Sequence, residues 1–457
     1  MKYDTIAAIS TARGKGGVAM IRISGDEALS VAERVFRSPS IKGEPIPRKC
    51  YYGELIRDGQ PIDDVTLTYF KAPNSYTGED VCEICCHGGL YVTQAVLEAV
   101  LSSGAKMAGP GEFTRRAYIN GKLTLSRAEA VGAVIDATND AQLRLSSSLM
   151  RGTLSNKLME IKGVMLDLIA RAYATIDYPD EDIEERDRDE FMSALLCIKN
   201  ELLTLKKSYR ATKAVTEGVK TAIIGRPNAG KSSLYNLLSG ESLAIVTSIA
   251  GTTRDVIENT VSVGDVTLRL ADTAGIRDTE DEVEKIGVSR AKDKLTESEL
   301  VLAVFDASET ENDEDLFVLE SASEKSAVAI INKCDKDRKM SQAFENKIAE
   351  KIKRVVYISA ETGEGLFDLS KNLRNMYALD EIDISNDGVV ANARQLSSVV
   401  NALERVENAF SELNLGATPD IVCFSLENAL SELEMIDATM VTEEIVDRIF
   451  SRFCVGK

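Results

Sequence analysis

The sequence predicts a multidomain α/β and α protein, in which a doubly wound α/β domain is inserted into an all-helical domain that follows an N-terminal α+β domain. Within 216–380, short apolar runs such as Val219–Ile224 and Ala327–Ile331 alternate with helical segments, as in a parallel sheet covered by helices. The stretches on both sides show helical spacing of apolar residues instead. We therefore expect four segments, of which the second and fourth pack together as one helical domain: 1–120, 121–215, 216–380 and 381–457.

The N-terminal segment alternates strand-like and helix-like stretches. Thr5–Ser10, Ala19–Ile23 and Val81–Cys86 are predicted strands, and 90–102 has the pattern of an amphipathic helix. The helical stretch that follows carries one apolar stripe with steps of three and four residues. The stripe consists of Leu154, Leu158, Ile161, Met165 and Leu168.

Composition limits the classes of protein to consider. With 457 residues, of which 44% are hydrophobic, the chain is long enough for about three domains with sizeable cores. No apolar run reaches the length of a transmembrane helix, so no membrane partner is expected. Eight scattered cysteines and the absence of a signal-like N-terminus predict a cytoplasmic protein. A net charge of −19 argues against indiscriminate nucleic-acid binding.

A phosphate-binding loop is predicted at Gly225–Ser233, GRPNAGKSS, directly after a predicted strand. Gly225 and Gly230 allow the chain to wrap so that backbone N–H groups face phosphate oxygens. In such a loop Lys231 reaches the β- and γ-phosphates and the Ser232 hydroxyl binds Mg²⁺. The segment is thus predicted to bind a nucleoside triphosphate.

Three further motifs follow in order, each at the end of a predicted strand. The carboxylate of Asp272 in DTAG is placed to hold Mg²⁺ through water, and the Gly275 N–H to contact the γ-phosphate. NKCD, Asn332–Asp335, offers a carboxylate to the N1 and N2 hydrogens of guanine, which adenine lacks. Ser359-Ala360 offers a backbone N–H to guanine O6. The combination predicts GTP as the nucleotide.

The loop TSIAGTTRD between the first two motifs resembles a switch segment, with Thr252 or Thr253 completing the Mg²⁺ shell. Ile276 stands where Ras-like enzymes carry the glutamine that positions water. Asn228 is a candidate ligand of a monovalent cation, and Glu284 a candidate for orienting the water. The residues expected to contact GTP are Asn228, Ala229, Gly230, Lys231, Ser232, Ser233, Thr247, Ser248, Ile249, Ala250, Gly251, Thr252, Thr253, Asp272, Thr273, Ala274, Gly275, Asn332, Lys333, Asp335, Ser359 and Ala360.

Over its whole length the chain resembles the MnmE (TrmE) family of tRNA-modification GTPases. The resemblance rests on AGTTRD, DTAGIRDTEDEVEKIG, GKGGVAMIRISG, SYTGEDVCEICCHGG, GPGEFTRRAYINGKLTLSRAEAV and the C-terminal FCVGK, where the family usually has FCIGK. It implies a folate-binding, dimerising N-terminal domain. It also implies that the homodimer and the FAD-dependent partner MnmG form a heterotetramer, which adds an aminomethyl-type (carboxymethylaminomethyl) group to C5 of the wobble uridine of certain tRNAs. The one-carbon unit would come from 5-formyl- or methylene-tetrahydrofolate.

The resemblance also assigns individual residues. The folate positions are Arg22, Glu79, Lys122 and Lys457. The K⁺ site is Asn228, Thr247, Ile249 and Thr252, the Mg²⁺ ligands are Ser232 and Thr253, and the water-orienting residue is Glu284. It implies that two nucleotide domains meet when K⁺ and GTP are bound, so that K⁺ replaces an arginine finger and hydrolysis drives a domain movement. Asn228, Lys231, Glu284 and Cys454 are the candidate catalytic residues.

Several alternatives remain open at this point. Cys454 is either a nucleophile or proton donor, or a small buried apolar residue. The Cys82-x-x-Cys85 string is better explained by a buried strand than by a metal site, and His87 either packs in its turn or contacts a ligand. Basic clusters, one including Arg116 and the other Lys351, either contact phosphates or face solvent. The alternative functions are an Era-like ribosome-assembly switch and a signalling switch.

Overall fold

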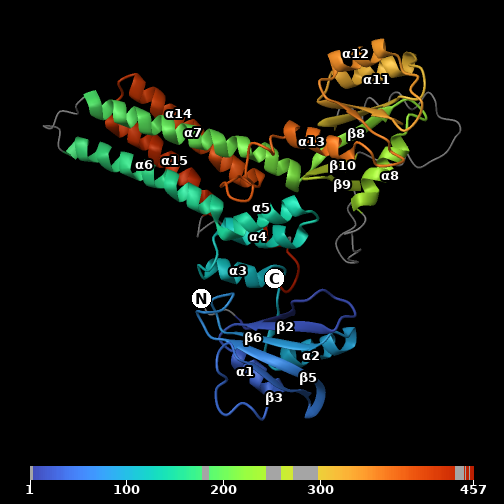
Figure 1. Ribbon diagram of the computed structural model, residues 1–457. Helices are drawn as coiled ribbons and strands as arrows, with labels where there is room; N and C mark the ends of the chain where they lie inside the picture. Colours follow the sequence, from blue (N-terminus) through green and yellow to red (C-terminus); the bar gives the residue numbers. More distant parts are fainter. Residues whose placement is uncertain are drawn as a thin grey trace. The chain divides into compact units, whose positions relative to one another are not determined.

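The computed structural model describes residues 4–177, 185–242, 259–270, 297–437, 447, 449–451 and 453–457. The chain forms two compact units, one of Met1–Gly132 with Glu434–Lys457 and one of Ala133–Leu433 (Figure 1). The multidomain α/β and α architecture is therefore present. No helix in the described ranges is both long and apolar enough to cross a membrane.

The first unit contains a seven-stranded sheet in the order β3-β4-β5-β6-β2-β1-β7. The β1–β7 pair is parallel and the other pairs are antiparallel. The strands are β1 (Ile6–Ile9), β2 (Val18–Ser24), β3 (Phe36–Arg37), β4 (Cys50–Arg57), β5 (Gln60–Phe70), β6 (Val81–His87) and β7 (Lys106–Met107). The unit's helices are α1 (Ala28–Val35), α2 (Leu90–Ser102), α3 (Glu112–Ile119) and α4 (Leu125–Asp136), the last of which continues into the second unit.

Alternation along the strands separates two cores. Ile21 and Ile23 belong to the main core, which α1 and α2 close on one face of the sheet. Ile6 and Ala8 point to the opposite face, where they pack against Phe113 of α3. This alternation is the period of two that a strand imposes.

The cysteine string of β6 follows the same alternation. Cys82 and Cys86 are buried in the main core, whereas Cys85 lies on the other face and is partly exposed. Because Cys82 and Cys85 lie on opposite faces, the C-x-x-C spacing cannot form a metal or redox pair. Within the described ranges no group of three or more His, Cys, Asp or Glu side chains could hold a metal ion. The predicted buried strand is present at this string, since Cys82 and Cys86 lie in the core.

The C-terminal residues fold back onto the first unit. Val455 pairs with Pro110 in an isolated bridge, and the N–H of Phe113 donates to the Lys457 carbonyl at 3.1 Å. The Ser10 hydroxyl donates to the Gly456 carbonyl at 3.0 Å. Gly456 has φ +101°, and a Cβ there would lie 2.1 Å from the Ile9 carbonyl oxygen, so this close approach requires glycine.

The second unit begins with a helical part. It contains α5 (Asp140–Arg151), α6 (Thr153–Asp177), α7 (Glu185–Thr216), α14 (Ala393–Asn414) and α15 (Pro419–Asp437), and the last of these runs on into the first unit. Figure 1 shows α6, α7, α14 and α15 alongside one another, and contacts link α7 to both α6 and α14. The predicted stripe on α6 is confirmed, since all five of its residues are buried. Helices from both sides of the α/β domain thus pack together.

The α/β domain lies between α7 and α14 in sequence. Its six-stranded sheet has the order β13-β12-β11-β8-β10-β9 and is parallel except for the β9–β10 pair. The strands are β8 (Val219–Gly225), β9 (Asn259–Val263), β10 (Val266–Leu270), β11 (Leu300–Asp306), β12 (Ala327–Asn332) and β13 (Val355–Tyr357). The helices are α8 (Lys231–Ser242), α11 (Asp313–Ser323), α12 (Gln342–Lys351) and α13 (Leu366–Met376).

Candidate functional site

The loop between β8 and α8 has the backbone that a phosphate cradle needs. Asn228 adopts φ +61° and Gly230 φ +98°, both in the left-handed range. A Cβ on Gly230 would lie 2.0 Å from the Asn332 side-chain nitrogen, so a larger residue is excluded there. The turn leads directly into α8, whose N-terminal amides are suited to bind anions.

Lys231 folds back over this loop. Its ammonium group donates to the carbonyls of Gly225 at 2.8 Å and Arg226 at 2.7 Å. Burial lowers the pKa of Lys231, and Glu314 partly opposes this shift. The ammonium is thus held at the strand end of the loop, where a nucleotide phosphate could replace carbonyl oxygens as its acceptor. Asn228 and Ser232 are exposed on the same loop.

Asn332 links the phosphate loop to the guanine-recognition motifs. Its side-chain nitrogen donates to the Ala229 carbonyl at 2.9 Å, and its side-chain oxygen accepts from the Ala360 N–H at 3.0 Å. Asn332 is 1% exposed, so its orientation is fixed by these two bonds and by packing. Three segments at the ends of β8, β12 and β13 are thereby brought together.

Lys333 and Asp335 of the same motif have different partners. Lys333 pairs with the buried Asp306 at 2.6 Å. Burial by itself would raise the pKa of Asp306, but hydrogen bonds from Lys333 and Ser308 outweigh it and lower that pKa. A hydrogen bond with the Ser359 side chain lowers the pKa of Asp335. Asp335 is therefore an ionised acceptor beside Ser359 and Ala360, as recognition of guanine N–H groups requires.

Arg226 contributes to this site, although the phosphate-loop motif accepts any residue type at that position. The guanidinium lies 2.9 Å from Glu309 and 3.3 Å from Asp315. The Arg226 side chain is only 10% exposed. It anchors the start of the loop to α11, and no sequence signal indicated this role, because any residue type fits that position of the motif.

Several predicted nucleotide contacts and the predicted water-orienting residue lie outside the described residues. They are Thr247, Ser248, Ile249, Ala250, Gly251, Thr252, Thr253, Asp272, Thr273, Ala274, Gly275 and Glu284. The strands β9 and β10, which join these two segments, are described. The Asn139 side-chain nitrogen donates to Ser262 at 3.1 Å, and that of Gln142 donates to the Val215 carbonyl at 2.9 Å and to Thr267 at 3.3 Å. The hairpin between the two segments is therefore hydrogen-bonded to the start of α5.

A polar cluster on the first unit contains the four predicted folate positions. Arg22 pairs with Glu83 at 2.8 Å and lies over the Tyr76 and Phe113 rings. Phe113 in turn donates its N–H to the Lys457 carbonyl at 3.1 Å.

Glu79 shortly precedes β6, and Lys122 follows α3. Glu79 accepts from Ser24 at 2.7 Å, and Lys122 donates to the Pro73 carbonyl at 2.9 Å. Gly78 packs against the Lys122 side chain, since a Cβ there would lie 3.3 Å from it. The Lys122 side chain thus lies next to the residue that precedes Glu79 in the chain.

Arg116 has neither of the two roles that the sequence left open, phosphate contact and a solvent-facing position. It is 4% exposed and pairs with Glu79 at 3.1 Å and Glu112 at 2.8 Å. It therefore neither contacts nucleic-acid phosphate nor faces solvent, because it orients Glu79. Lys351 of the second basic cluster is paired with Glu320.

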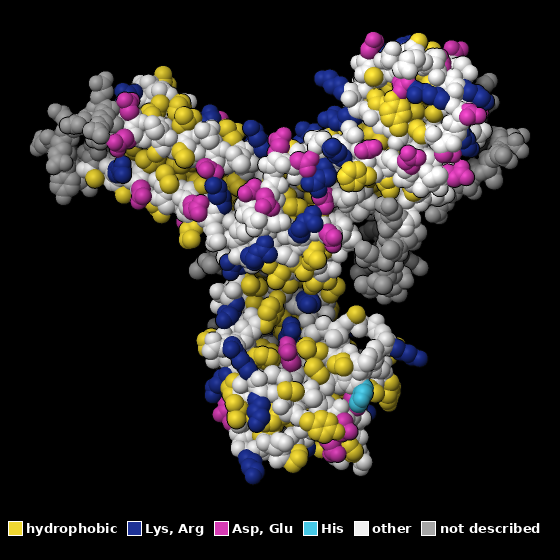
Figure 2. Space-filling model, in the orientation of Figure 1, with side chains coloured by type: hydrophobic (Ala, Val, Ile, Leu, Met, Phe, Trp, Pro, Cys, Tyr) yellow, Lys and Arg dark blue, Asp and Glu magenta, His cyan; other side chains and the backbone are white. Residues whose placement is uncertain are grey.

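Cys454 and His87, whose roles the sequence left open, are both exposed. Cys454 is exposed while its carbonyl accepts from the Gly111 N–H at 3.3 Å, so it is not a small buried apolar residue. His87, the single histidine of the sequence, is also exposed, and its Nδ1 lies 2.6 Å from Asp63 (Figure 2). On the face of the second unit seen in Figure 2, positive and negative side chains are interspersed.

Comparison with known proteins agrees with this arrangement. Residues 5–122 match the family described as "GTP-binding protein TrmE N-terminus", and residues 125–454 match "MnmE helical domain". The chain is 40% identical over 458 residues to a tRNA modification GTPase MnmE of Clostridioides difficile, covering 99% of each chain. It is 39% identical over 464 residues to that of Thermoanaerobacter pseudethanolicus, covering 100% of each. The G domain of the Thermotoga maritima FeoB iron transporter is 27% identical and covers 35% of this chain and 98% of its own, with a TM-score of 0.25.

The phosphate loop, the guanine-recognition motifs and the doubly wound sheet define a multidomain GTPase. The chain belongs to the MnmE (TrmE) family, which two family descriptions and full-length relatives at about 40% identity show.

Proposed function

We propose that the chain is a GTPase acting in tRNA modification. It would work with the FAD-dependent partner MnmG to add a carboxymethylaminomethyl-type group to C5 of the wobble uridine. The observation that carries the proposal is the full-length match to proteins named tRNA modification GTPases, which extends through both flanking domains. An Era-like ribosome-assembly GTPase shares the nucleotide motifs but lacks the N-terminal domain. The chain would act in the cytoplasm as a homodimer within a heterotetramer.

The geometry of the G domain supports a specific mechanism of hydrolysis. Lys231 would neutralise charge on the β- and γ-phosphates, and Ser232 and Thr253 would hold Mg²⁺. Asn228, at the exposed turn of the loop, would bind K⁺ together with Thr247, Ile249 and Thr252, and Glu284 would orient the water. The hydrogen bonds from Asn139 and Gln142 to β9 and β10 supply a route by which changes in the two switch segments would reach the helical domain.

The first unit would hold the tetrahydrofolate that supplies the one-carbon unit. Arg116 and Ser24 donate hydrogen bonds to the Glu79 carboxylate. The carboxylate oxygens can still accept further hydrogen bonds from pterin N–H groups. Lys122 and Arg22 would meet the carboxylates of the glutamate tail. The Lys457 backbone is fixed to Phe113 nearby. The exposed Cys454 thiol supports a chemical role for that residue, as nucleophile or proton donor.

Analysis of tRNA nucleosides tests the proposed function. In a strain lacking this chain, mass spectrometry should detect wobble uridine without the carboxymethylaminomethyl-type group. A wild-type level of the modified nucleoside in that strain would contradict the proposal and favour the ribosome-assembly alternative.

The K⁺ site predicts a dependence on the cation. GTP turnover should be on the order of 10-fold or more faster in KCl than in NaCl at equal ionic strength, because K⁺ stabilises charge developing on the transferred phosphoryl group. Asn228→Ala should remove the difference. Since alanine is strained at φ +61°, Asn228→Gly is the matched control, which keeps the backbone relaxed while lacking the ligand.

Both variants should hydrolyse GTP at the same slow rate in the two salts. Equal turnover of the wild-type protein in KCl and NaCl would contradict the K⁺ site. So would an Asn228→Gly variant that keeps the full K⁺ stimulation.

A further inference from the structure

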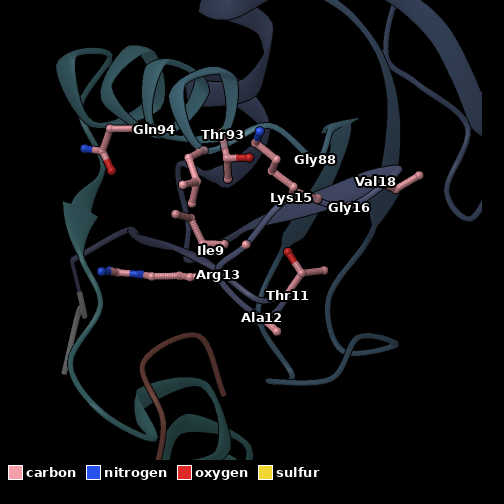
Figure 3. A pocket seen from close by; sticks show the side chains of 13 residues that line it. Ile9, Thr11, Ala12, Arg13, Lys15, Gly16, Val18, Gly88, Thr93 and Gln94 are labelled. Atoms are coloured by element: carbon pink, nitrogen blue, oxygen red, sulfur yellow. The ribbon is translucent and has the colours of Figure 1, made fainter. Parts of the chain in front are cut away.

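A cavity of about 520 Å³ lies in the first unit, apart from the polar cluster around Arg22 (Figure 3). It is formed by the loop 10–17, which joins β1 to β2, and by the starts of β2 and α2. Ile9 lines it and belongs to the α2 side of the sheet, whereas Arg22 points to the other side, because Ile9 pairs with Ile21 and Ala8 with Arg22. The volume is in the range of small-molecule pockets.

The loop is held rigidly against the turn that precedes α2. The Gly16 N–H donates to the Gly88 carbonyl at 2.9 Å. A Cβ on Gly88 would lie 2.5 Å from the Gly16 carbonyl oxygen, so the two backbones are in direct contact. At the other end of the loop, the Thr11 hydroxyl accepts from the Met20 N–H at 3.2 Å. The cavity is therefore largely preformed.

The lining carries positive charge without a counter-charge. Arg13 and Lys15 line the cavity and no Asp or Glu does. Neither cation has an ion pair within the described part of the chain. In Figure 3 the Lys15 side chain extends toward α2, and Arg13 extends from the loop in a different direction, past Ile9.

The first turn of α2 adds to the positive electrostatic potential of the cavity. It contains no acidic residue, and Gly89 provides no side-chain cap for its N–H groups. Two cations and a helix N-terminus at one cavity make its electrostatic potential positive, which favours a bound anion. Ile9, Val18 and Leu90 supply apolar surface beside the charges.

We propose that this cavity binds a small organic anion. A phosphate or carboxylate group would be held by Lys15 at the start of α2, with the apolar part of the molecule against Ile9 and Val18, while Arg13 on the same lining adds positive potential. This site is additional to those for GTP and for folate, and it does not depend on either. Cations, a glycine-rich loop and a concave apolar wall together are the usual elements of such recognition.

Calorimetric titration of the full-length protein tests the proposal. Phenyl phosphate and benzoate are the probes, because they share an apolar ring and distinguish a phosphate from a carboxylate head group. Saturating GDP and Mg²⁺ occupy the phosphate loop between β8 and α8. At least one probe should bind saturably at one site per chain, and Arg13→Gln with Lys15→Gln should weaken that binding roughly 100-fold.

Two control variants separate charge from shape. Lys42→Gln removes an exposed cation of the same unit outside the cavity and should leave binding unchanged. Gly88→Ala keeps both cations but displaces the loop, and should weaken binding while the protein remains folded by circular dichroism. The double variant should bind 5-formyltetrahydrofolate as the wild type does.

Three results would overturn the proposal. Absence of saturable binding of both probes at millimolar concentration is the first, and equal binding by wild type and the double variant is the second. The third is a double variant that loses affinity for tRNA but not for either probe, because the two cations would then contact nucleic-acid phosphate at the surface.

Discussion

Replacing Lys231 with alanine is expected to lower GTP turnover on the order of 1,000-fold or more, measured as phosphate release under single-turnover conditions. Lys231 supplies the one cation that folds back over the phosphate loop within the described residues, bonded to the carbonyls of Gly225 and Arg226. Its loss removes charge stabilisation where the transferred phosphoryl group becomes more negative. Gly225 and Arg226 keep their backbone positions because β8 and the Arg226 ion pairs hold them.

Lys220→Ala is the matched control for this variant. Lys220 lies on the same strand, β8, with an exposed side chain away from the loop. Its replacement should leave GTP turnover unchanged. A Lys231→Ala protein that keeps turnover within a few-fold of wild type would show that the loop is not the hydrolytic site.

Replacing Asp335 with asparagine is expected to change the base that the protein recognises. The ionised carboxylate beside Ser359 would accept two guanine N–H groups, and asparagine could accept only one of them. Affinity for GTP should fall roughly 10- to 150-fold, since one hydrogen bond is lost and a hydrogen bond to a charged group contributes about 1.5–3 kcal/mol. Xanthosine triphosphate carries a carbonyl at C2 that the new amide can donate to, so its affinity should rise.

Fluorescent nucleotide titration measures both affinities. Asp337→Asn is the control, because that carboxylate lies two residues further along and is exposed. The variant should keep the preference for GTP. An Asp335→Asn protein that still prefers GTP over xanthosine triphosphate would place guanine recognition elsewhere.

The sequence predicted the elements whose residues are buried on both faces. Every residue of β11 and β12 is buried, which produces the continuous apolar runs that were interpreted as parallel strands. β9, NTVSV, was not predicted, because it alternates polar and apolar residues and its pairing with β10 depends on the turn at Gly264. The C-terminal FCVGK contains no sign that it packs beside β1, since its partner Ser10, which follows β1, lies 446 residues earlier.

The candidate site was predictable only where its residues lie in one continuous segment of the chain. The phosphate loop combines strand, glycine turn and helix in one segment, so its sequence is sufficient. The bridge made by Asn332 to Ala229 joins residues 103 positions apart and could not be inferred. Arg116 was misjudged for the same reason, since its burial depends on Glu79 as well as on Glu112 of its own helix. Its basic neighbours in sequence suggested an exposed patch instead.

The central claim is that hydrolysis at the loop between β8 and α8 serves tRNA modification. The most direct test complements a strain lacking this chain with wild-type, Lys220→Ala or Lys231→Ala protein at equal expression, followed by mass spectrometry of tRNA nucleosides. We predict that the first two restore the carboxymethylaminomethyl-type wobble uridine and that Lys231→Ala does not. Full restoration by Lys231→Ala would contradict the claim.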